Sequence, residues 1–390
     1  MLTIKEKRVA ELPPKPSVNL GVSDRNLLDL DYSGKYQLPR TALSPDNPKV
    51  LKILAIKVNF RKEVVDDPLS TGDGTFDLRA KETFQAEEGH LIDPSPHNSE
   101  YFDAHLRALN EYWQVVSQGR LTLQWDIFPR QSDSAYQLDS AMAYYGLRPP
   151  WYGLGDFFFD AIRKADQDTA IQFYDEASMT EKYDAYVIFH AGSDQQNNRG
   201  SIWGPDTPAD LYTGFVKIGV PFAVDSGRVI IYEGVIVPET PSQDGAVTAL
   251  NAVFAHEFGH QLGLVDLYDT RTFKTMVGDF ALMDHNGFGY NVDFGEDVPV
   301  LVFGVLPVFP CAWSRAYLGF VDIVEVTKVN NIDVAAAGYV SDKAKVLLVP
   351  INADEYFLVE NRRTNLDDHE ITGIMQDSAT EVILYPRSPI

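Results

Sequence analysis

The sequence lacks several features that would define whole classes of protein. It has one cysteine, Cys311, among 390 residues, which excludes an internal disulfide framework. No apolar run is long enough to cross a bilayer, and the N-terminal residues have neither the apolar stretch nor the cleavage site of a signal peptide. Basic residues are scarce: 33 Lys and Arg stand against 56 Asp and Glu, for a net charge of -23. A nucleic-acid partner is therefore not expected, because it would require a basic surface.

The composition is that of a globular protein, since hydrophobic residues make up 45% of the chain. Residues 1–47 are rich in Pro, Asp, Ser and Asn and predict an extended N-terminal arm or a pro-segment. Residues 48–320 alternate strand and helix patterns, which is typical of a layered α/β or α+β domain. Residues 321–390 contain short strand-like runs and predict a β-rich C-terminal region.

Hydrophobic periodicity predicts the elements of the central region. Runs of β-branched and apolar residues predict buried strands at 50–60, 183–189 and 229–236, and alternation predicts a strand at 121–128. Helical spacing predicts helices at 101–117, 154–165 and 245–264. Residues 61–97 are polar and contain several Gly and Pro, which predicts a surface excursion. We therefore expect a mixed sheet of about five strands that is covered by helices.

The last predicted helix contains the motif His256-Glu257-Phe258-Gly259-His260. Two histidines four residues apart lie on one helix face, so both imidazoles can bind a single zinc ion. Glu257 is placed to polarise a zinc-activated water and to take its proton as general base. Zinc would also polarise the carbonyl group of the bond that is cleaved. Because this short pattern recurs by chance, the alternative is an ordinary helix with two histidines.

The residues after the motif extend the pattern. Gly263 stands three residues beyond His260, where a helix can end and turn. Asp266 follows after three more residues, at the position where a longer zinc-peptidase pattern has its third ligand. Asp269 and Glu296 are competing ligands, and a hydrogen-bonding role at the helix end is the alternative for Asp266. Met283 lies in a turn-like context and matches the Met-turn of metzincins, where a methionine forms an apolar floor beneath the histidines.

At HEFGHQLGLVDLYD (256–269) and DFALMDHNG (279–287), the chain resembles the immune inhibitor A family of secreted bacterial metallopeptidases. Weaker similarities follow the same order at 110–123, 186–205, 311–320 and 355–363. Val265 departs from the family, since a proline is expected before Asp266, and the sequence DHNG after Met283 replaces smaller residues. The resemblance implies a metzincin-like zincin fold and a secreted, calcium-assisted zinc endopeptidase that acts on proteins. It also implies His256 and His260 as ligands and Glu257 as the base.

Other polar residues are weaker candidates, each with a structural role as the alternative. His190, His285 and Tyr290 are candidates for contacts with the substrate or with the oxyanion of the tetrahedral intermediate. Hard oxygens on expected loops are candidates for calcium binding. These are Asp194, Asn197, Asn198, Asp269 and Asp279.

The sequence thus predicts a zinc-dependent endopeptidase that cleaves proteins or peptides. One rival is a non-catalytic binding or surface protein that keeps the fold, which the intact Glu257 disfavours. A second rival is a zinc enzyme that attacks a non-peptide amide or ester. An extracellular location is expected from the resemblance alone.

Overall fold

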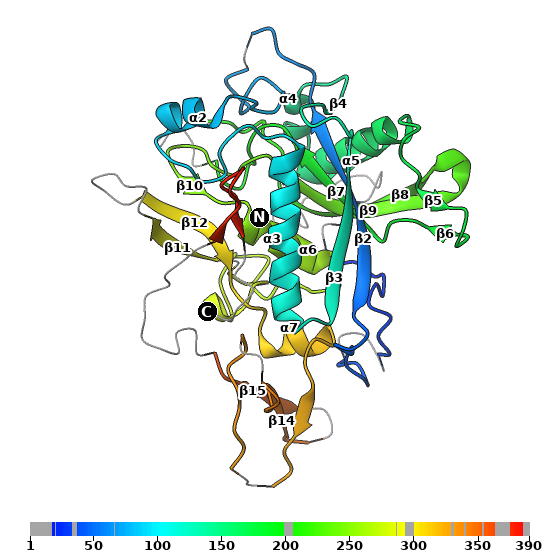
Figure 1. The fold of residues 1–390 in the computed structure, drawn as a ribbon, viewed down its shortest axis with the longest axis vertical. Coiled ribbons are helices and arrows are strands. Elements are labelled where there is room, and N and C mark those ends of the chain that lie inside the picture. Colours follow the sequence, from blue (N-terminus) through cyan, green and yellow to red (C-terminus); the bar gives the residue numbers. More distant parts are fainter. Residues whose placement is uncertain are drawn as a thin grey trace.

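The centre of the protein is a mixed, seven-stranded sheet (Figure 1). The computed structural model describes residues 18–19, 21–32, 37–65, 67–198, 206–285, 287–292, 300–328, 331–338, 341–352, 355–362 and 375–384. The sheet has the order β1-β8-β9-β7-β2-β3, and β4 also pairs with β2. Its strands are β1 (Val18–Asn19), β2 (Lys49–Asn59), β3 (Leu121–Phe128), β4 (Tyr136–Gln137), β7 (Ala185–His190), β8 (Gly214–Val224) and β9 (Val229–Pro238). The strands from β9 to β3 run parallel, whereas β8 is antiparallel to both β9 and β1.

Helices cover both faces of this sheet. The long ones are α3 (Ser99–Val116), α5 (Pro150–Asp166) and α6 (Asn251–Gln261). The ring of Phe189 on β7 lies 4.3 Å from that of Phe102 on α3 and 5.6 Å from that of Phe254 on α6. The ring of the next residue, His190, lies 5.7 Å from that of Phe157 on α5. Because successive side chains of a strand point to opposite faces, α3 and α6 share one face and α5 covers the other.

Smaller elements surround this core. A three-stranded sheet, in the order β10-β12-β11, packs beside α6, and a second one, β13-β14-β15, lies near α7 at the bottom of Figure 1. The elements are α2 (Lys81–Glu88), α4 (Met142–Gly146), β5 (Tyr174–Asp175), β6 (Thr180–Glu181), β10 (Val247–Thr248), β11 (Gly287–Val292), β12 (Val300–Pro307), α7 (Ala312–Tyr317), β13 (Ile323–Glu325), β14 (Val346–Pro350), β15 (Tyr356–Glu360), β16 (Met375–Gln376) and β17 (Ile383–Leu384).

The mixed sheet covered by helices confirms the predicted α/β class, although the sheet has seven strands. The helix predicted at 245–264 is shorter because Val247–Thr248 pairs in parallel with β12. The prediction of a surface excursion at 61–97 holds for most described residues of 61–89, which are exposed or partly exposed, but not for 90–97, which are mostly buried. The segment 61–97 contains α2, and its residues Phe76 and Ile92 are buried.

The predicted boundaries at residues 47 and 320 remain predictions, but both flanking segments contact the central region. Leu27, Leu28 and Leu30 of the arm belong to the main hydrophobic core. Ile383 packs in a second apolar cluster with residues of β10 and β12. Within the described ranges, no helix is both long and apolar enough to cross a membrane.

Candidate metal centre

The C-terminal end of α6 reverses the chain at a glycine. Gly263 has a φ of 105°, a conformation that residues with a Cβ rarely adopt. Its N–H donates to the carbonyl of His260 at 3.0 Å, and Leu264 N–H donates to that of Gly259 at 2.9 Å. Three residues later Leu267 N–H donates to Met283 O at 2.8 Å. These bonds return the chain to the helix, so that Asp266 lies beside the two histidines.

Backbone carbonyls orient both histidine rings. His256 Nδ1 lies 2.9 Å from the carbonyl oxygen of Leu282, and His260 Nδ1 lies 2.9 Å from that of Leu264. A carbonyl can only accept, so each Nδ1 carries the proton and each Nε2 keeps its lone pair. Metal-binding histidines are held in this way in proteins. The two rings are therefore preset to offer Nε2 as a ligand atom.

Asp266 completes a cluster of three ligand groups. Its Oδ1 lies 3.3 Å from His256 Nε2 and 3.2 Å from His260 Nε2, and the three ligand atoms lie within 4.8 Å of one another. While both rings are neutral, with the proton on Nδ1, this buried Oδ1 receives no hydrogen bond, and it gains one only when an Nε2 is protonated. Three lone pairs that converge in a buried site require a positive charge between them. Two imidazoles and a carboxylate are a donor set that suits zinc, so the residues present fit this metal.

The pKa shifts show the same demand for positive charge. Burial lowers the pKa of His260, but the carboxylates of Asp266 and Glu257 outweigh it and raise the pKa to about 9. Burial raises the pKa of Asp266, but the two histidines hold it well below its usual range. In the metal-free protein a proton on His260 therefore compensates the carboxylate.

Glu257 is held apart from this cluster by the main sheet. Its side chain is buried, and its Oε2 accepts a hydrogen bond from Phe215 N–H of β8 at 2.7 Å. The metal-ligand cluster found among the described residues does not include it. The carboxylate is therefore near enough for its charge to act on His260, while the hydrogen bond from β8 fixes its position.

Met283 packs directly beneath the motif helix. It is fully buried, and its Sδ would lie only 2.7 Å from a Cβ on Gly259. Gly259 stands between the two ligand histidines in the sequence, so the methionine contacts the helix at the level of the ligands. This close approach explains why the motif has a glycine at that position.

The candidates for contacts with substrate have different environments. His190 has no exposed surface, its ring packs near those of Phe60 and Phe157, and burial lowers its pKa to about 4. The ring of His190 thus packs in the core of this structure, and its contact with substrate stays a prediction. His285 is half-exposed, with its Nδ1 2.6 Å from Asp279 Oδ1, and Tyr290 lies on β11.

The acidic candidates for calcium binding belong to no metal-type cluster among the described residues. Asp194 accepts hydrogen bonds from Asn197 and from Thr213 Oγ1. Asp269 caps a tight turn through Arg271 N–H at 2.8 Å. Among the described residues, the metal-type cluster is that of His256, His260 and Asp266, and calcium gains no support. The described residues do not include Glu296, the more distant rival ligand. They also do not include 199–205, which belong to the resembling segment 186–205.

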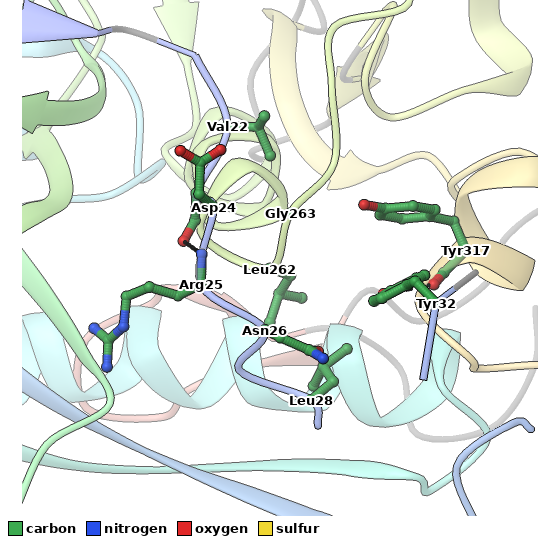
Figure 2. A pocket seen from close by; sticks show the side chains of 10 residues that line it. Val22, Asp24, Arg25, Asn26, Leu28, Tyr32, Leu262, Gly263 and Tyr317 are labelled. Atoms are coloured by element: carbon green, nitrogen blue, oxygen red, sulfur yellow. Dashed lines mark hydrogen bonds between the residues drawn. The ribbon is translucent and has the colours of Figure 1, made fainter. Parts of the chain in front are cut away.

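The N-terminal arm packs against the end of the motif helix. Ser23 N–H donates to the carbonyl of His260 at 3.0 Å, and β1 pairs with the edge of β8. A pocket of about 320 Å³ lies between the arm and the helix end (Figure 2). It is lined by Leu262, Gly263 and Tyr317 and by arm residues such as Arg25 and Tyr32. The three ligand side chains do not line this pocket, so it is separate from the metal centre.

The sequence did not reveal several residues that build the site. Strand β8, which holds Glu257, was not predicted because Gly219 and Pro221 interrupt its apolar pattern. The carbonyls of Leu264 and Leu282 act through the backbone and leave no signal in residue type. Asp284, whose Oδ2 accepts from three backbone N–H groups, follows Met283 directly and could have been noted as a turn-forming aspartate.

Two imidazoles and a carboxylate converge here from a helix and the following turn and could hold a metal ion. Such a donor set is found in catalytic zinc sites of hydrolases. The chain belongs to the immune inhibitor A peptidase M6 family, whose catalytic domain matches residues 49–289. Membership places it among the metallopeptidases, with proteins as substrates and a metal ion as cofactor. The match includes the motif, Asp266 and Met283, and it ends before the resembling segments at 311–320 and 355–363. A comparison with curated proteins found no match.

Proposed function

We propose that the protein is a zinc-dependent endopeptidase in which His256, His260 and Asp266 bind the metal. The observation that carries the proposal is the convergence of the three ligand atoms within 4.8 Å in a buried site, with Asp266 Oδ1 3.3 Å from His256 Nε2 and 3.2 Å from His260 Nε2. When bound there, zinc would acidify a water molecule and polarise the scissile carbonyl. The Met283 floor and the reversal at Gly263 support a metzincin-like arrangement. The proposal includes an extracellular place of action, which rests on the family resemblance alone.

Glu257 is the proposed general base. Glu257 directly follows His256 in the sequence, and its carboxylate is buried. The hydrogen bond from Phe215 N–H fixes one of its oxygens. A base held in this way can take a proton from the attacking water and later pass it to the leaving amine. Because Glu257 is outside the ligand cluster, it can accept and donate this proton without breaking a bond to the metal.

The proposal is tested on the purified chain with two readouts. Metal analysis should find about one zinc ion per chain, as expected for a centre with three protein ligands. Casein hydrolysis should stop when a chelator removes the metal and return when zinc is added. Bound zinc without hydrolysis would favour the rival function of a non-catalytic protein that keeps the fold. Hydrolysis that persists in the metal-free protein would contradict the proposal.

A further inference from the structure

The loop between Asp266 and Met283 begins and ends at the metal centre. Asp266 directly precedes it, and Leu267 N–H donates to Met283 O at 2.8 Å, which closes the base of the loop. At the returning end the carbonyl of Leu282 accepts the hydrogen bond from His256. Side chains near either end of this loop are therefore neighbours of the ligands.

This loop exposes large apolar side chains. The exposed fractions are 41% for Phe273, 67% for Met276, 41% for Val277 and 59% for Phe280. Single exposed apolar residues are ordinary on protein surfaces, but four within eight residues form a concentrated patch. Phe280 stands two residues before Leu282, so their Cα atoms are at most about 7 Å apart. The patch thus starts within two residues of Leu282, whose carbonyl holds the His256 ring through Nδ1.

A buried carboxylate makes the loop rigid. Asp284 Oδ2 accepts from the backbone N–H groups of Met276 at 2.8 Å and Gly278 at 2.6 Å, and also from that of Val277. The other half is a tight turn, in which Phe273 N–H donates to Asp269 O at 2.7 Å. Since Asp284 is the residue after Met283, the Met-turn itself anchors the apolar segment. A loop ordered in advance costs little entropy when a ligand binds to it.

Two ion pairs occupy charged groups at this loop, and exposed Lys274 adds a positive charge to the same surface. Asp279 pairs with His285 at 2.6 Å, and Asp269 pairs with Arg271 at 3.5 Å. We propose that the loop 267–283 is a preformed apolar wall that selects peptides with a large apolar side chain next to the cleaved bond. Met276 and Phe280 are the specificity-determining residues. This inference rests on the proposed function, because the peptide is the occupant that the metal centre brings to the wall.

The test uses a series of peptides that differ only in the residues flanking the cleaved bond, which are Leu or Phe in one set and Ser in the other. Met276→Ser and Phe280→Ser are compared with Met179→Ser, whose methionine is equally exposed, at 68%, in the separate β5–β6 hairpin. Both loop variants should lower kcat/KM for the apolar peptides by about ten-fold, the usual size of such pocket contacts. The Ser peptides and the Met179→Ser enzyme should change by less than about two-fold.

Each outcome supports or overturns the inference. An equal fall for both peptide sets, or no change in either, would overturn the wall while leaving the peptidase intact. Cleavage by the unaltered enzyme without any preference for apolar residues would do the same. A wild-type chain that binds zinc and cleaves none of the peptides would instead contradict the proposed function. Zinc content measured on every variant shows that the metal centre is undisturbed.

Discussion

Replacing Gly259 with Ala tests how the motif helix packs on Met283. A Cβ at this position would lie 2.7 Å from Met283 Sδ and 3.4 Å from its methyl carbon. Favourable contacts between non-bonded carbon atoms fall at about 3.5–4.0 Å. The methionine cannot move into solvent, because it is fully buried. Gly259→Ala should therefore push the helix and the methionine apart.

Two opposing terms set the size of the effect. Overpacking a buried contact costs about 1–3 kcal/mol, whereas Ala in a helix is about 1 kcal/mol more favourable than Gly. We expect the free energy of unfolding of the metal-free protein to fall by about 0–2 kcal/mol, because the helix propensity of Ala offsets part of the overpacking cost. Gly214→Ala is the control, because an added Cβ there meets no atom within 4 Å. Its effect should stay within about 0.5 kcal/mol.

A double-mutant cycle measured by urea denaturation separates this contact from general damage. Met283→Ala alone should cost about 2–5 kcal/mol, because it opens a cavity. In the double variant the added methyl group enters that cavity, so the combined loss should be at least about 1 kcal/mol smaller than the sum. Additive losses would refute the packing of Met283 against the helix at Gly259.

Three further predictions concern the metal centre. Asp266→Ala should lose zinc and remain folded, whereas Asp269→Ala should keep the metal, as metal analysis and circular dichroism can check; the reverse result would assign the third ligand to Asp269. Since the pKa of His260 is raised to about 9 in the metal-free site, zinc must displace a proton, and competition titrations should show an affinity that rises about ten-fold per pH unit up to about pH 9. A flat profile between about pH 7 and pH 9 would contradict this shift. The same shift means that the charge on His260 stabilises the metal-free fold fully below about pH 6.5, and that this stabilisation is lost as the pH rises to about 9. Met283→Leu nearly conserves volume and should keep zinc and activity, while loss of zinc would mean that the sulfur is a ligand.

The sequence predicted those parts of the site that depend on local geometry. His256 and His260 share a helix face by their spacing alone, and Gly263 marks the reversal that returns Asp266 to them. Met283 could be placed because it follows the third ligand in the order of the longer pattern. The structure brings all of these residues together.

Features that depend on tertiary pairing could not be predicted. Strand β8 contains Gly219 and Pro221, which weaken its pattern, and its place in the sheet comes from pairing with β9. Val247–Thr248 has the apolar character of the following helix and becomes a strand because β12 lies beside it. The apolar side chains of the loop 267–283 also have no periodicity that would reveal how Asp284 orders them.

The variant Glu257→Gln tests the central claim most directly, because it separates metal binding from catalysis. Glu257 lies outside the ligand cluster, and the Gln side chain can still accept from Phe215 N–H. We expect the variant to keep about one zinc ion per chain, while its kcat for casein or a peptide falls by about 10²- to 10⁴-fold through loss of the base. A Glu257→Gln enzyme that binds zinc and hydrolyses its substrate at nearly the wild-type rate would contradict the account.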